Sequence, residues 1–359
     1  MFVKLLMLVI FFAVMIGVGI SARRHATTVN DFVLGGRGVG PWLTAFAYGT
    51  SYFSAVVFIG YAGQFGWKYG LASTWIGLGN ALIGSLLAWV ILGRRTRVMT
   101  KHLGSATMPE FFGSRFGSGS LKIAASIIIF IFLIPYTASV YNGLSRLFEM
   151  AFHVPYQVCV IAMALLTAVY VILGGYMATA INDFIQGIVM LIGIVAVILS
   201  VLHQQGGFVE AVGTLAQIPS EVPLTAGQPG AYASFFGPDP MNLLGVVILT
   251  SLGTWGLPQM IHKFYTIRSE KAIATGTVIS TIFAIVISGG SYFLGGFGRL
   301  YDSPEIYTAQ GAVAYDSIVP TMLSGLPDIL IGVVVMLVLS ASMSTLSSVV
   351  LTSSSTLTL

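Results

Sequence analysis

Apolar runs of about 20 residues alternate with shorter polar connections along the chain. The runs fall at about 4–22, 41–66, 71–93, 121–148, 156–175, 180–203, 241–262, 272–298 and 327–358. A helix needs about 20 apolar residues to cross the hydrocarbon core of a bilayer, whereas a barrel strand needs about 10 alternating ones. The pattern therefore predicts an all-α integral membrane protein of nine spans, in which each helix satisfies its own backbone hydrogen bonds.

Composition supports lipid as the solvent. Of the 359 residues, 56% are hydrophobic and only 8% are charged, whereas a soluble domain carries about 25% charged residues. The first run is followed, not preceded, by Arg23 and Arg24, which is the reverse of a signal peptide and favours a retained helix. The single cysteine, Cys159, offers no disulfide framework.

Basic residues predict the orientation of the spans. With the N-terminus outside, twelve basic residues fall in inner loops and four in outer ones, as the positive-inside rule requires. We expect a multi-pass protein of the plasma (inner) membrane, whose net charge of +4 reflects topology and no nucleic-acid partner. The inner residues are Arg23, Arg24, Arg37, Arg94, Arg95, Arg97, Lys101, Arg115, Lys122, Lys263, Arg268 and Lys271; the outer ones are Lys4, Lys68, Arg146 and Arg299.

Three polar features lie at membrane depth. Asp183 has apolar neighbours on both sides, and a carboxylate there costs several kcal/mol unless it faces a cavity or a cation; the alternative is an interfacial N-cap of the sixth span. The last run carries hydroxyls on one helical face, with Thr345 beside them, and the second run has a glycine, Gly49, at which the helix could unwind. The hydroxyls of that face are Ser340, Ser344, Ser347 and Ser348.

Together these features predict a cation site near the midplane of the membrane. Sodium prefers several oxygen ligands, which hydroxyls provide without adding charge. A plain packing role remains the alternative for the hydroxyl face, because small and hydroxyl residues also line close helix contacts in membranes.

Enzymatic chemistry finds little support in the sequence. The histidines show no metal-ligand spacing, and there is no P-loop, no Ser/His/Asp arrangement and no pair of intramembrane acids. We expect no catalytic residues, no cofactor and no metal other than sodium.

Several spaced motifs occur in the order of a known family. They are Asp31-Phe-Val-Leu-Gly-Gly-Arg37, Phe58-Ile-Gly60, Met108-Pro-Glu-Phe-Phe112, Gly174-Gly-Tyr-Met-Ala178 followed by Asn182-Asp183 and Gln186, and Ser342-Met-Ser-Thr-Leu-Ser-Ser348. The chain thereby resembles the sodium:solute symporter family, with a texture closest to its pantothenate and proline branches.

The resemblance implies a leucine-transporter-like inverted-repeat helix bundle in one transmembrane domain, 1–359. Its parts would be an extra first helix (1–22), a first repeat (41–203) and a second repeat (241–359). The family continues with further helices, so the resemblance also implies a second repeat cut short at Leu359 and leaves open whether the chain functions alone.

The resemblance also implies site residues. One sodium would be held by the carbonyls of Thr50, Phe53 and Ala341 and the hydroxyls of Ser344 and Thr345. A second sodium, present in some members, would use Asp183, Ser344, Ser347 and Ser348. The substrate would lie beside Gly49, Tyr52, Ser54, Tyr136, Trp255 and Gln259.

The predicted function is a sodium-coupled secondary active symporter that imports a small organic solute, of the carboxylate or amino-acid class, by alternating access. Val56 and Val57 stand where sugar-carrying members have polar residues, so a hexose is disfavoured. The alternatives are a membrane-embedded ligand sensor built on a symporter-like domain, or a passive channel. The number of sodium ions, proton coupling through Asp183 and the oligomeric state stay open.

Overall fold

The computed structural model describes residues 2–23, 27–152 and 154–358, which are mostly helical; Arg24, counted above among the inner basic residues, lies outside them. The longer helices are α1 (Phe2–Ala22), α3 (Pro41–Tyr52), α8 (Gly119–Phe152), α9 (Tyr156–Gln204), α11 (Pro240–Leu252), α13 (Glu270–Ala284) and α16 (Asp328–Thr358). The shorter ones are α2 (Val29–Leu34), α4 (Ala62–Tyr69), α5 (Thr74–Gly79), α6 (Arg94–His102), α7 (Met108–Phe116), α10 (Phe208–Gln217), α12 (Pro258–Thr266), α14 (Gly290–Gly295) and α15 (Tyr315–Ser324).

Short π-helical and 3₁₀-helical segments, whose turns are wider and tighter than those of an α-helix, join these helices. The π-helical stretches are η3 (Val56–Tyr61), η5 (Asn80–Leu87), η6 (Trp89–Gly93) and η10 (Ile285–Gly289). The 3₁₀ turns are η2 (Gly35–Arg37), η4 (Gly70–Ser73), η7 (Pro223–Thr225), η8 (Ala231–Ala233), η9 (Gly253–Gly256), η11 (Gly298–Tyr301) and η12 (Pro304–Ile306).

Among the described residues, 6 helices are long and apolar enough to cross a membrane, and the bent pair Pro240–Gly256 and Pro258–Thr266 raises the number to 7. This count is below the nine runs of the sequence for two reasons. The helical stretch Val56–His102 passes through the end of the second run and the whole third run, and the fifth run gives only the shorter apolar helix Val160–Val169.

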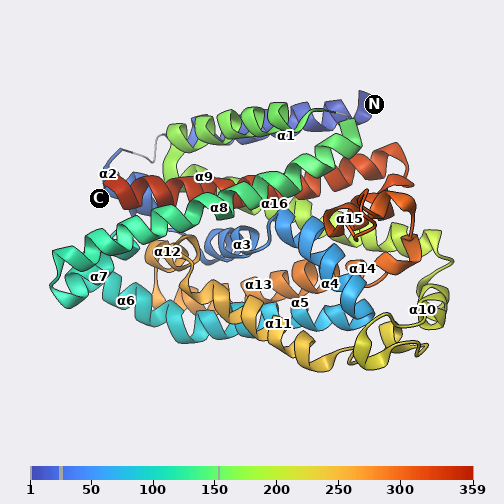
Figure 1. Cartoon of the computed structure of the whole chain (residues 1–359). Coiled ribbons are helices and arrows are strands. Elements are labelled where there is room, and N and C mark those ends of the chain that lie inside the picture. The colour runs from blue at the N-terminus through green and yellow to red at the C-terminus, as the bar shows by residue number, and fades with distance from the viewer. Residues whose placement is uncertain (1, 24–26, 153, 359) are drawn as a thin grey trace.

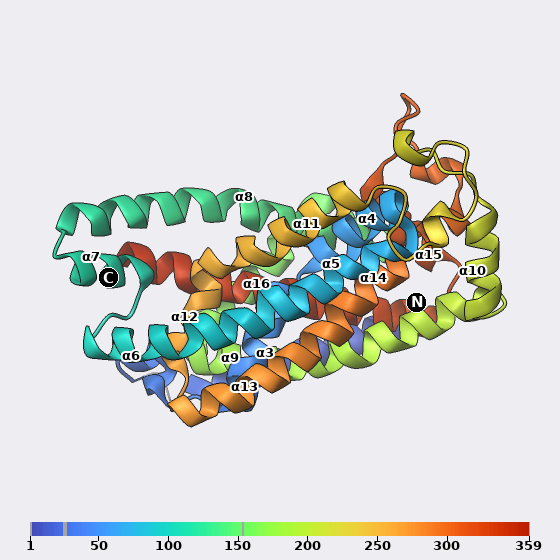
Figure 2. The same ribbon diagram turned by 90° about the horizontal axis from the view of Figure 1, so that it is seen from below.

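The helices lie lengthwise in one bundle, with different connections at its two ends (Figures 1 and 2). The N-terminus and α10 lie at one end, whereas α2, α6, α7 and the last described residues lie at the other (Figure 2). The basic connections that the sequence predicts to be inner are therefore gathered at the end opposite to the N-terminus.

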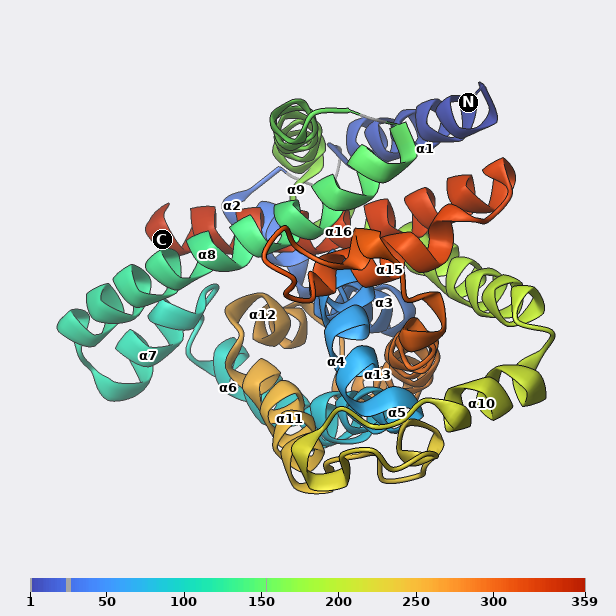
Figure 3. The ribbon, with the colours of Figure 1, turned by 45° about the vertical axis from the view of Figure 1, so that its right-hand side comes forward.

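Helix α16 lies inside the bundle, where it packs against α9, α8, α1 and α3 (Figure 3). Its stretch from Val334 to Val349 is almost wholly buried, whereas Ile10 of α1, Phe132 of α8 and Ile172 of α9 are more than half exposed. Large apolar side chains on so many outward faces indicate a surface that lipid covers.

Local sequence explains where helices begin. Helix α2 starts after Thr28, whose hydroxyl accepts a hydrogen bond from the Asp31 amide at 3.1 Å. Helix α7 starts with a reciprocal pair, in which Thr107 and Glu110 each accept from the other's backbone amide. Such N-caps satisfy amides that have no partner inside the helix.

Two helices break at particular residues, one of them away from the glycine that the sequence indicates. Helix α3 does not unwind at Gly49, which stays helical and has the Phe283 ring against it; the break comes at Phe53 and Ser54. Helix α9 bends at Gly175 (φ 55°), where a side chain would meet Phe32. A left-handed backbone of this kind favours glycine, which gives the Gly174-Gly175 motif a structural reason.

Candidate functional site

Four buried groups meet where α16 crosses the broken end of α3. The Ser344 hydroxyl donates to the carbonyls of Thr50 at 3.0 Å and Ala341 at 3.1 Å. The Thr345 hydroxyl donates to the Ala341 carbonyl at 3.0 Å and approaches the Thr50 carbonyl at 3.4 Å. We call Thr50, Ala341, Ser344 and Thr345 the oxygen cluster; all four are fully buried.

The oxygen cluster contains four of the five residues predicted for the first sodium. The fifth, Phe53, caps α3 with extended backbone (φ −109°, ψ 91°), which takes its carbonyl out of the helical pattern. The donor set is made only of neutral oxygens, whose remaining lone pairs suit a hard cation such as sodium. These residues therefore fit a sodium ion chemically.

A second, charged group lies nearby in the interior. The Lys263 Nζ donates to the Ser348 hydroxyl at 2.9 Å and lies 3.6 Å from Asp183 Oδ2. It also faces the Tyr176 ring, 5.3 Å from the ring centroid. The Ser348 hydroxyl is also 2.9 Å from that of Ser51, next to Thr50 on α3. We call Asp183, Lys263 and Ser348 the charged cluster.

The position of Lys263 corrects a sequence interpretation. The positive-inside count placed it in an inner loop, but it lies within α12 and is 1% exposed. A signal was present: Gln259 and Lys263 are four residues apart after Pro258, which places both on one face of a helix that begins at a proline. The apolar residues Met260 and Ile261 between them, together with this spacing, are typical of a buried helix.

The four residues predicted for a second sodium are only partly brought together. The Ser344 hydroxyl belongs to the oxygen cluster, and that of Ser347 donates to the Ser344 carbonyl at 3.0 Å. Ser348 is linked to Asp183 through Lys263. Within the described part of the chain, neither carboxylate oxygen of Asp183 has a hydrogen-bond partner.

The residues predicted to contact substrate fall into two sets. Tyr52, Tyr136 and Gln259 form the first, because Tyr136 lies close to both of the others; the Tyr52 hydroxyl donates to the Thr250 carbonyl at 3.1 Å. Gln259 is fully buried, and neither of its amide atoms has a hydrogen-bond partner among the described residues. An unpaired buried amide is costly, so this side chain is suited to a polar ligand.

The second set is occupied with protein contacts. The Trp255 indole donates to the Ile83 carbonyl at 3.0 Å, and Ser54 accepts from the Val56 amide at 3.3 Å. Gly49 faces the Phe283 ring.

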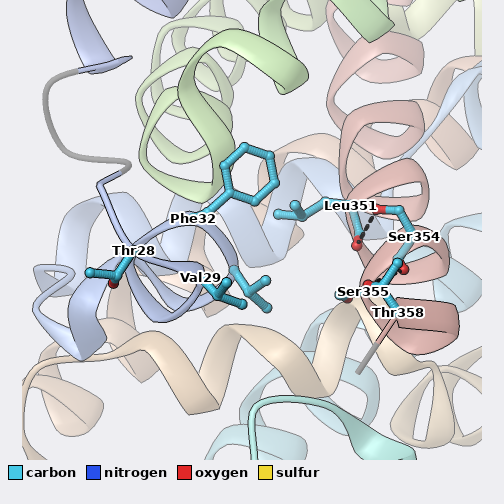
Figure 4. Close-up of a pocket in the computed structure, with 8 residues that line it drawn as sticks. Thr28, Val29, Phe32, Leu351, Ser354, Ser355 and Thr358 are labelled. Carbon is cyan, nitrogen blue, oxygen red and sulfur yellow. Dashed lines mark hydrogen bonds between the residues drawn. The ribbon is translucent and has the colours of Figure 1, made fainter.

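A separate cavity of about 260 Å³ lies between α2 and the end of α16 (Figure 4). It shares no residue with either cluster, but Leu351 and Ser355 continue the Ser344 and Ser348 face of α16 towards it. Its lining residues are Thr28, Val29, Phe32, Val33, Leu351, Ser354, Ser355 and Thr358.

Comparison with known proteins agrees with the helical bundle. A sodium/proline symporter of Staphylococcus aureus (strain JH9) is 29% identical over 368 residues, which cover 98% of this chain and 67% of that protein. The sodium/proline symporter of strain JH1 gives the same values. A solved substrate-bound, outward-open structure of a Na⁺-coupled sialic acid symporter superimposes with a TM-score of 0.80 at 18% identity, covering 99% of this chain and 72% of that one.

The structural likeness confirms the predicted all-helical, leucine-transporter-like bundle, while the division into repeats stays a prediction. The model of one protein family, the sodium:solute symporters, matches residues 32–359. Since that match covers well over half of this multi-pass helical chain, the protein belongs to the sodium:solute symporter family.

Proposed function

We propose that the protein imports a small amino acid, or a related small carboxylate, together with sodium by alternating access. The observation that supports this best is the oxygen cluster, because it joins the broken end of α3 to α16 through neutral oxygens only. Helix breaks of this kind hold substrate and coupling ion in secondary transporters.

The carbonyls of Thr50, Phe53 and Ala341 and the hydroxyls of Ser344 and Thr345 would hold sodium, which supplies one positive charge to a neutral site. Because these groups come from two different helices, an occupied site favours the arrangement in which α3 and α16 are close. A ligand shifts an equilibrium by its difference in affinity for the two states. Sodium bound from outside would thus stabilise the conformation that accepts substrate.

Gln259 supports a small polar solute. Its buried amide lies near Tyr136, one residue after Pro258, where α12 begins. The positive end of a helix dipole favours an anionic group such as a carboxylate. Since the two related proteins of S. aureus are sodium/proline symporters, proline is the first substrate to test.

The gathering of α2, α6 and α7 at the end opposite to the N-terminus supports an orientation with the N-terminus outside (Figure 2). A plasma (inner) membrane location accords with uptake of an external solute.

The test is uptake into proteoliposomes that contain the purified protein, with labelled proline, pantothenate and short monocarboxylates offered separately. We expect one of these solutes to accumulate only with an inward sodium gradient. Ligand binding without accumulation would reject transport in favour of a sensor, and flux that ignores sodium would reject symport in favour of a channel.

A further inference from the structure

Lys263 brings a full positive charge into the interior of the bundle. Its side chain lies in α12, beyond the 53° bend that separates this helix from α11 and η9. The residue is 1% exposed, and its charged partner Asp183 is fully buried. Burying a charge without compensation is very costly, so such residues are paired.

The ammonium lies where the second cation of the predicted site would have to be. It takes the Ser348 hydroxyl as a hydrogen-bond acceptor at 2.9 Å and lies 3.6 Å from Asp183 Oδ2. Of the remaining predicted ligands, Ser344 donates into the oxygen cluster and Ser347 into its own helix. The residues present therefore do not fit a second sodium while Lys263 is in place.

Charge balance gives the same answer. Asp183 contributes one negative charge and Lys263 one positive charge, and the oxygen cluster contributes none. A sodium ion added beside Asp183 would leave two cations facing one carboxylate at a few Å in a medium of low dielectric constant. Replacement of the ammonium, rather than addition to it, is the arrangement that conserves charge.

We infer that Lys263 is the resident cation of the Asp183 site, so that the protein binds one sodium ion, in the oxygen cluster. This inference rests on the proposed function and deepens it, because it makes Lys263 the residue that determines ion stoichiometry. The Ser348 and Ser51 hydroxyls connect this internal cation to α3 one residue from Thr50. Movement of α12 would therefore shift α3 at the oxygen cluster through these hydrogen bonds.

The experiment is equilibrium binding of radioactive sodium to purified protein in nanodiscs, with thermal unfolding at increasing sodium as a second readout. The wild type should bind one sodium per chain. Lys263→Met removes the ammonium but keeps the aliphatic stem, and it should bind two, with thermal stabilisation that depends more steeply on sodium concentration. The double variant Lys263→Met with Asp183→Asn removes both charges and should return to one.

The matched control is Lys4→Met. Lys4 of α1 also forms an ion pair with an aspartate of α16, because its Nζ lies 2.9 Å from Asp328 Oδ1. Asp328 is at the start of α16, several helical turns before Ser344 of the oxygen cluster. This variant should keep the wild-type sodium count. If Lys263→Met does not fold without sodium, rescue by sodium supports the inference, and the double variant provides the count in a protein that has no unpaired charge.

Two outcomes overturn the inference: a wild type that binds two sodium ions, or a Lys263→Met protein that still binds one. Both leave sodium binding, and hence the proposed function, intact. A wild type that binds no sodium would instead reject the proposed function itself, so the two failures are distinguishable.

Discussion

The oxygen cluster and the charged cluster lie one helical turn apart on α16 but hold positive charge in different ways. Ser344 and Thr345 contact only neutral carbonyls from α3 and α16. The oxygen cluster therefore carries a positive charge only when it binds a cation from solution. Ser348 meets an ammonium that is covalently part of the chain. A neutral site can couple to an ion gradient, whereas a site that carries its own cation responds mainly to movement of its helix.

The largest effect should come from breaking the charged cluster on one side only. Asp183→Ala leaves the Lys263 ammonium buried without a counter-charge, which we expect to cost about 3–5 kcal/mol of stability. Thermal unfolding in detergent measures it. Removing both charges, by Asp183→Asn with Lys263→Met, should recover most of the loss; equal destabilisation by both proteins would show that the ion pair is not the reason.

The oxygen cluster should respond in sodium affinity rather than in stability. Thr345→Ala removes one ligand of a charged guest, a loss of about 1.5–3 kcal/mol, so the sodium concentration for half-maximal uptake should rise at least about tenfold. Thr352→Ala, a substitution of the same type farther along α16, is the control. A similar sodium requirement in both variants would contradict the assignment of Thr345.

Gln259 belongs to neither cluster and separates substrate from ion effects. Gln259→Leu removes a buried amide that has no partner within the described residues, so the substrate-free protein should gain about 1–3 kcal/mol. Substrate affinity should fall while radioactive sodium binding stays the same, as measured by uptake kinetics and by sodium binding on the same preparation. Unchanged uptake kinetics would remove Gln259 from the substrate site.

The smallest effect concerns the link between the clusters. Ser51→Ala removes the hydrogen bond of Ser51 with Ser348, which contributes about 0.5–1.5 kcal/mol. We expect a rise of a few-fold in the sodium requirement, because the charged cluster then no longer braces α3 beside Thr50. Ser354→Ala, whose hydroxyl bonds only within α16 in the contacts described, should leave the sodium requirement unchanged.

Sequence patterns predicted the helical segments well because lipid imposes a simple rule. A run of about 20 apolar residues has no alternative to a helix in a bilayer, and each predicted run is mostly helical in the described residues. The breaks were harder to place. The sequence pointed to Gly49, but that residue stays helical with the Phe283 ring packed against it, and the chain opens at Phe53 and Ser54 instead.

The hydroxyl face of α16 was visible in the sequence because its spacing follows the helical period. The spacing did not show which hydroxyl belongs to which cluster, because Ser344 and Ser348 differ only in the residues of other helices that contact them. Thr50 reaches Ser344 from α3, and Lys263 reaches Ser348 from α12; both contacts join residues distant in the chain.

By itself the sequence determined the solvent, the helical class and the family, since these depend on composition, period and ordered motifs. Only the tertiary structure decided that Lys263 is an interior cation and not an inner-loop residue. A charge count along the chain cannot distinguish a lysine at a helix end from one buried beside a carboxylate. That distinction depends on the bend at Leu257 and on how α12 packs against α3 and α16.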